Sequence, residues 1–149
     1  MTNENFPKII NFDLDGTIAD FYGVDGWLDD LINRNTRPYE IAKPLVNLSA
    51  LARKLNSLQK KGYIINIISW TAKNSTREFN DRIKIAKLNW LAKHLKSVKF
   101  DNIHIVEYGT PKHTLSKGIL FDDEENNRKN WGVNAYDVNN ILGVLKTIV

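Results

Sequence analysis

The feature that most constrains the fold is a regular alternation of short β-rich runs with longer helical stretches along the 149 residues. Five short runs predict strands, at residues 8–13, 63–68, 102–106, 118–121 and 133–136. Three longer stretches predict helices, at residues 45–61, 76–95 and 139–148. Strands separated by helical segments pair in parallel, so the chain is expected to form a doubly wound α/β fold with helices on both faces of a parallel sheet.

The predicted helix over residues 76–95 divides into a buried stripe and a basic exterior. The stripe is expected to consist of Phe79, Ile83, Ile85, Ala86, Trp90 and Leu91. The basic residues are interpreted as solvated, and they are Arg82, Lys84, Lys87, Lys93, Lys96 and Lys99. Trp131 is assigned to the core together with Trp90.

Composition limits the setting. The length fits one domain (residues 1–149), and we find neither a repeat nor a linker. The absence of cysteine excludes disulfides and thiolate metal sites and fits a reducing cytoplasm. No apolar run approaches the roughly 20 residues of a membrane span, and the N-terminus lacks the features of a signal peptide. A net charge of +4 is interpreted as a solvated surface in preference to a nucleic-acid interface.

Polar residues follow several of the predicted strands. Ligands of doubly wound sheets lie beyond the carboxyl ends of the strands. The residues at those ends include Asp13, Ser69 and Asp122. We therefore expect a functional site where they meet.

The most specific motif is the string DLDGT at residues 13–17. A D-x-D-G-T string occurs by chance in about one chain of this size in a thousand. Asp13 and Asp15 can face one cavity if the chain leaves the sheet in a loop, and Gly16 permits a tight departure. A simple strand-end turn is the alternative. A calcium loop is excluded because its twelfth position, which needs an acid, is Val24.

Three further residues fit phosphate chemistry. The Ser69 hydroxyl, with backbone amides around it, suits phosphate oxygens, although a plain serine turn has the same letters. Asp122 suits Mg²⁺, which prefers a few carboxylates plus waters and phosphate oxygens. Lys112, ten residues earlier, can pair with a nucleophilic carboxylate and a phosphate, whereas Lys117 is expected to be solvated at the edge of a strand.

Four features of the sequence together resemble the four motifs of the haloacid dehalogenase-like phosphatases. They are the string DLDGT, the serine that ends IINIIS, a lysine and the pair Asp122-Asp123. The resemblance covers residues 8–148. The spacing from Lys112 to Asp122-Asp123 and the helix carrying KLNWL at residues 87–91 are similar to the 5′(3′)-deoxyribonucleotidase branch.

The resemblance implies a role for each motif residue. Asp13 is the nucleophile that becomes phosphorylated, and Asp15 is the general acid and base. The resemblance further implies the Mg²⁺ ligands, the phosphate ligands and a supporting residue. Mg²⁺ is held by the Asp13 carboxylate, the Asp15 main-chain carbonyl and Asp122; Ser69 and Lys112 contact the phosphate; and Asp123 supports Lys112 or a metal-bound water. Outside the motifs, Trp70 follows Ser69 and is a candidate for contacting the leaving group of the substrate.

Residues 17–44 leave room only for a small lid in place of a cap domain. We expect a short helix over residues 26–33, a loop around Pro38 and a relatively open site. The lid aromatics Phe21, Tyr22 and Trp27 can stack on a base. Ordinary packing against the core is the favoured interpretation of these residues.

The sequence therefore predicts a Mg²⁺-dependent phosphomonoester hydrolase that acts on a nucleotide or another small phosphorylated metabolite. Three alternatives remain: a phosphatase of nucleic-acid ends, a non-catalytic protein that binds phosphorylated ligands, and a phosphate-accepting signalling domain.

Overall fold

A five-stranded parallel sheet forms the centre of the molecule, which we describe from a computed structural model covering residues 7–148. The strands are β1 (Ile9–Phe12), β4 (Ile64–Trp70), β5 (Asn102–Val106), β6 (Ile119–Phe121) and β7 (Ala135–Tyr136). Their order is β5-β4-β1-β6-β7, so the chain moves outward from β1 first in one direction and then in the other. This arrangement confirms the doubly wound α/β prediction and locates its switch point beside β1.

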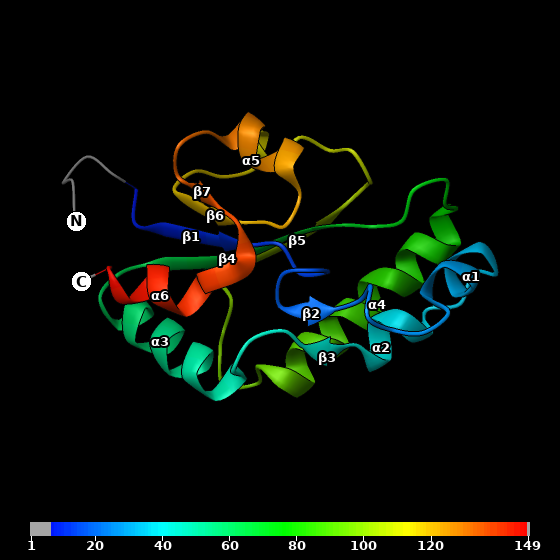
Figure 1. The fold of residues 1–149 in the computed structure, drawn as a ribbon, viewed down its shortest axis with the longest axis horizontal. Coiled ribbons are helices and arrows are strands. Elements are labelled where there is room, and N and C mark those ends of the chain that lie inside the picture. The colour runs from blue at the N-terminus through cyan, green and yellow to red at the C-terminus, as the bar shows by residue number, and fades with distance from the viewer. Residues whose placement is uncertain (1–6, 149) are drawn as a thin grey trace.

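Helices cover both faces of the sheet. The long helices are α3 (Leu48–Lys60) and α4 (Arg77–His94), and they share one apolar core with the short α6 (Ile141–Lys146). The helix α5 (Glu125–Trp131) lies on the opposite side of the sheet from α3 and α6 (Figure 1). Two single-turn 3₁₀ helices complete the fold, η1 (Lys112–Thr114) and η2 (Val138–Asn140).

Several local predictions need correction. Ile85 is 59% exposed because it lies two positions from both Ile83 and Lys87, on the outer side of α4. Trp131 is only half-buried, and its indole N–H donates to the carbonyl of Gly118 at 2.9 Å. The last strand is shorter than expected, since Val133 is fully solvated.

The lid is a compact element tied to the domain at both ends. Its two short strands, β2 (Ala19–Asp20) and β3 (Lys43–Pro44), pair antiparallel and close the segment. Between them lie α1 (Trp27–Ile32) and α2 (Arg37–Ile41). A helix replaces the expected loop around Pro38 because proline is tolerated in a helix's first turn.

A second apolar cluster anchors this lid to α4. It joins Phe21 and Tyr39 of the lid to Phe79, Ile83 and Ala86 of the helix. The rings of Phe21 and Tyr39 are 4.6 Å apart, within the range of favourable aromatic packing. The lid is therefore held over the end of the sheet where β1 and β4 finish.

A row of asparagines crosses the sheet. The Asn66 amide donates to Asn11 at 3.0 Å, and the Asn102 amide donates to Asn66 at 3.0 Å. The Asn11 amide donates to the carbonyls of Lys117 and Ile119. Because a one-residue slip would bury these amides without partners, the row helps to fix the register of β5, β4, β1 and β6.

None of the helices within residues 7–148 combines the length and the apolarity needed to cross a bilayer.

We expect Gly118→Ala to destabilise the fold more than Gly109→Ala. Both glycines have φ +89°, which costs an L-residue about 1–2 kcal/mol. A Cβ at Gly118 would also collide with the carbonyl oxygen of Ile9, whereas a Cβ at Gly109 meets open space. Chemical denaturation should show about 1–3 kcal/mol of additional loss at Gly118. Equal losses would mean that the contact between Gly118 and β1 is not tight.

Candidate active site

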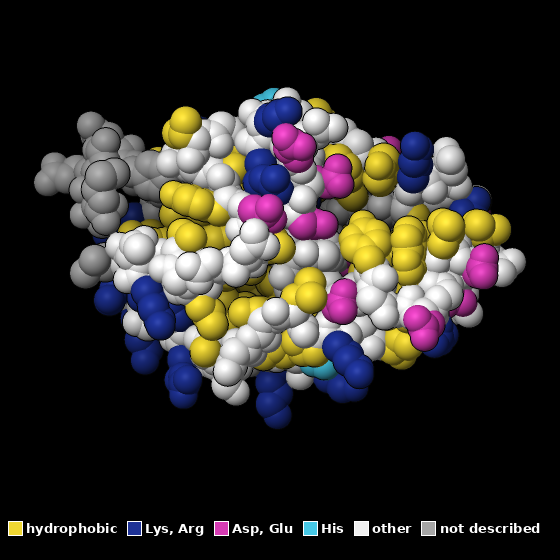
Figure 2. Space-filling view, in the orientation of Figure 1, with side chains coloured by type: hydrophobic (Ala, Val, Ile, Leu, Met, Phe, Trp, Pro, Cys, Tyr) yellow, Lys and Arg dark blue, Asp and Glu magenta, His cyan; other side chains and the backbone are white. Residues whose placement is uncertain are grey.

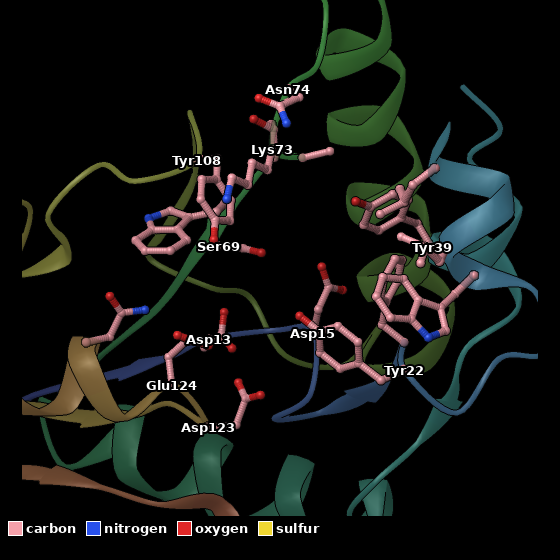
Figure 3. A pocket seen from close by; sticks show the side chains of 18 of the residues that line it. Asp13, Asp15, Tyr22, Tyr39, Ser69, Lys73, Asn74, Tyr108, Asp123 and Glu124 are labelled. Carbon is pink, nitrogen blue, oxygen red and sulfur yellow. The ribbon is translucent and has the colours of Figure 1, made fainter. Parts of the chain in front are cut away.

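The carboxyl ends of β1, β4 and β6 meet at a cavity of about 570 Å³. Its lining includes every site residue predicted from the sequence: Asp13, Asp15, Ser69, Trp70, Lys112, Asp122 and Asp123. Figure 3 shows Asp13, Asp15 and Asp123 on one side of this cavity and Ser69 beyond them. Residues separated by more than a hundred positions thus share one site.

Lys112 connects two of these strand ends. Its ammonium donates to Asp13 Oδ1 at 2.9 Å and to Asp122 Oδ2 at 2.8 Å, and all three groups are buried. Burial lowers the pKa of Lys112, but the two carboxylates outweigh it, so the pKa lies above its ordinary value. Lys117 is exposed, and the geometry therefore favours Lys112 as the motif lysine.

Asp13 is held as a carboxylate. Burial acts to raise its pKa, but the charge of Lys112 and hydrogen bonds from Asp123 and Lys112 bring the pKa below the ordinary value. The hydroxyl of Thr17 donates to the second oxygen, Asp13 Oδ2, at 3.0 Å. An ionised, oriented carboxylate is the form that a nucleophile requires.

Asp122 and Asp123 crowd the same corner. Burial and the nearby Asp13 charge raise the pKa of Asp122 to about 6, against the opposing effect of Lys112. Burial and a hydrogen bond with Asp13 raise the pKa of Asp123 to about 8. Asp123 thus contacts Asp13, and Thr17 at 3.4 Å. Of its two predicted roles, the contact with Lys112 is not found, because the carboxylates that Lys112 contacts are those of Asp13 and Asp122.

Gly16 makes this crowding sterically possible. It has φ +79°, and a Cβ there would collide with the carboxylate of Asp123. The tight departure predicted at Gly16 is therefore present, and it also allows the loop after β6 to approach the loop after β1.

Three carboxylates form a group with the chemistry of a metal site. One oxygen each from Asp13, Asp122 and Asp123 lies within 4.8 Å of the others. Hard carboxylate oxygens suit Mg²⁺, and a cation would relieve the repulsion that raises two of the pKa values. Asp123 thus joins the expected ligands Asp13 and Asp122, while the carboxylate of Asp15 lies outside the group.

Lys87 is buried, so its predicted place on the solvated exterior of the helix was wrong. Its side chain is only 1% exposed, and its ammonium lies 2.8 Å from Asp15 Oδ2. It also donates to Ser69 Oγ and to the carbonyl of Trp70, each at 2.6 Å. The sequence spacing could have indicated this burial, because Lys87 lies four positions from both Ile83 and Leu91 in the buried stripe of α4.

The environment of Asp15 differs from that of Asp13. Burial raises the pKa of Asp15 above its ordinary value, and the Lys87 charge only partly offsets this effect. The pKa values of the two carboxyl groups in the DLD sequence are therefore shifted in opposite directions. Such a separation is typical of a nucleophile next to a general acid.

The lid supplies an apolar wall to the cavity. Tyr22 and Tyr39 line one side, opposite Ser69 and Tyr108 (Figure 3). Tyr22 is 53% exposed and stands edge-on to Trp27, whereas Phe21 is buried in the second cluster. Figure 2 shows hydrophobic side chains gathered over the α1 region beside a group of acidic ones. All three predicted lid aromatics therefore line the cavity, and Phe21 and Trp27 also pack in or against the second cluster.

No protein-family model matches the chain, and no curated protein matches it either.

We expect excess Mg²⁺ to raise the melting temperature of the wild-type protein, because an ion held by the three carboxylates would bind the folded state alone. At a tenfold excess over Kd the gain is about 1.4 kcal/mol. Asp122→Asn should abolish the shift, measured by differential scanning calorimetry with Mg²⁺ or EDTA. Asp29→Asn, an exposed carboxylate of the lid, is the matched control and should retain it. An unchanged shift in Asp122→Asn would exclude this group as the metal site.

Proposed function

We propose that the protein is a Mg²⁺-dependent phosphomonoesterase that acts through an aspartyl-phosphate on Asp13. The observation that carries the proposal is the arrangement around Asp13, an ionised carboxylate bonded to Lys112 and facing a cavity beside Asp15. The resemblance of the four motifs to haloacid dehalogenase-like phosphatases supports the same reaction.

In the first step the Asp13 carboxylate attacks phosphorus. A bond forms between an Asp13 oxygen and phosphorus as the bond from phosphorus to the leaving oxygen breaks. Asp15, whose pKa is raised, gives its proton to that leaving oxygen. Ser69 and Lys112 line the cavity, and we expect the hydroxyl and the ammonium to bind phosphate oxygens there.

In the second step water hydrolyses the acyl phosphate. Asp15, now ionised, takes a proton from the water as its oxygen attacks phosphorus, and inorganic phosphate leaves as the Asp13 carboxylate is regenerated. Asp13, Asp122 and Asp123 would hold Mg²⁺, together with the main-chain carbonyl of Asp15 that the resemblance implies. The bound ion would supply positive charge to offset the repulsion between the anionic nucleophile and the phosphate.

The residues of the lid favour a substrate with an aromatic or apolar leaving group. Leu28 and Ile32 of α1 are more than half exposed, and both line the cavity together with Tyr22 and Trp27. Apolar side chains gathered at the mouth of a cavity mark a binding surface. A nucleoside fits this description better than a bare sugar does.

We expect phosphate release from a panel of nucleotides, sugar phosphates, aryl phosphates and end-phosphorylated oligonucleotides to require Mg²⁺ and Asp13. Asp13→Asn should lower kcat by at least about 10⁴-fold, because the amide of asparagine cannot replace the carboxylate as the nucleophile. The measurement is inorganic phosphate release with Mg²⁺ or EDTA, with circular dichroism to check the fold.

Appreciable turnover in Asp13→Asn would overturn the covalent mechanism. Release from no member of the panel, with Mg²⁺ binding intact, would favour a protein that binds phosphorylated ligands without hydrolysing them. A preference for oligonucleotides that weakens steeply with salt would favour a nucleic-acid end phosphatase.

We expect Leu28→Gln to raise KM for an aryl phosphate or a nucleotide about fivefold, which corresponds to about 1 kcal/mol of lost apolar contact. The kcat/KM for a small sugar phosphate should not change. Ile41→Gln is the matched control, because Ile41 is 50% exposed on the other lid helix and does not line the cavity. Equal effects of both substitutions would show that the leaving group does not contact α1.

A further inference from the structure

All three N–H donors of the Lys87 ammonium have acceptors inside the protein. An ammonium has three N–H donors and no acceptor. Lys87 gives one to Ser69 Oγ, one to the carbonyl oxygen of Trp70 and one to Asp15 Oδ2, at 2.6, 2.6 and 2.8 Å. No donor is left for a substrate, so whatever Lys87 does at the cavity it does through these neighbours.

The bond to Ser69 determines how that hydroxyl is oriented. Because an ammonium only donates, Ser69 Oγ must be the acceptor in this contact. The hydroxyl proton of Ser69 is then free to be donated elsewhere, and Ser69 lines the cavity that holds Asp13. Phosphate oxygens are acceptors, so this orientation presents the donor that a bound phosphate requires.

The bonds to Asp15 and Trp70 connect two loops. Asp15 follows β1 and Trp70 ends β4, whereas Lys87 belongs to α4, which shares the apolar core with both strands. A charge buried this deeply is costly unless its geometry is complete. Here all three partners belong to residues that line the cavity, so the position of Lys87 in the buried stripe of α4 brings its charge to the site.

We propose that Lys87 is a positioning residue: it turns the Ser69 hydroxyl toward the phosphate and holds the Asp15 carboxyl at the leaving-group side of the cavity. This inference rests on the proposed phosphatase function. It assigns to α4 a part in the reaction that none of the four sequence motifs contains.

The test is a double-mutant cycle on inorganic phosphate binding with Mg²⁺ present. The four proteins are the wild type, Ser69→Ala, Lys87→Met and the double variant. Ser69→Ala should weaken phosphate binding about tenfold in the wild type, the usual loss for a hydrogen bond to a charged group. In the Lys87→Met background the same change should cost about threefold or less, because the hydroxyl is no longer held in its donating orientation.

A second readout addresses Asp15. Lys87→Met should lower kcat more for an alkyl phosphate, whose leaving oxygen needs a proton, than for p-nitrophenyl phosphate, which leaves without one. Lys87→Arg should recover part of the loss. Lys84→Met removes a neighbouring exposed charge from the same helix and should leave both readouts unchanged.

Removal of one partner of a buried pair can prevent folding. The cycle is therefore repeated in an Asp15→Asn background, where the carboxylate is no longer charged, with phosphate binding measured by calorimetry. The first cycle, without the Asp15 substitution, decides the role of Lys87 when its four proteins are folded and the wild type is active. Additive effects of Ser69→Ala and Lys87→Met on phosphate binding would then overturn that role and leave the proposed phosphatase activity intact. Absence of Mg²⁺- and Asp13-dependent turnover in the wild type would instead overturn the proposed function.

Discussion

The bridge from Lys112 to Asp13 and Asp122 is the interaction on which the site depends. It joins the loops that follow β1 and β6, the two strands beside the switch point of the sheet. Without the cation between them, two buried carboxylates would repel each other at a place where burial already disfavours charge. The same bridge keeps Asp13 ionised, so one contact serves both the fold and the proposed chemistry.

Lys87 plays the corresponding part between β1 and β4. Each lysine lies at one side of the DLDGT loop, with Lys112 on Asp13 and Lys87 on Asp15. The two carboxyl groups are two residues apart, yet their pKa values move in opposite directions. Burial acts to raise both, but at Asp13 the Lys112 charge and the hydrogen bonds outweigh it, whereas at Asp15 the Lys87 charge offsets it only in part. Asp123 completes the cluster by contacting Asp13 across the space that Gly16 leaves open.

The lid adds a surface of a different kind. Phe21 and Tyr39 pack against α4, which fixes the segment over the strand ends. Tyr22, Trp27 and Leu28 remain at the cavity and give it an apolar side opposite the charged one. One wall of the site thus carries charged groups of both signs, and the other wall is apolar. Such a site suits a molecule with a phosphate at one end and a flat or apolar group at the other.

The sequence alone determined the alternating elements, the parallel sheet and the strand-end positions of Asp13, Ser69 and Asp122, because these depend on local periodicity and on a general rule of sheet topology. It also favoured Lys112 over Lys117 from order along the chain. Only the tertiary structure decided the burial of Lys87, the partner of Asp123 and the two roles of the lid aromatics. Each depends on contacts between segments that are far apart in sequence. A lysine in an apolar stripe has the same sequence whether it faces solvent or three acceptors, and here the acceptors come from the loop after β1 and from β4.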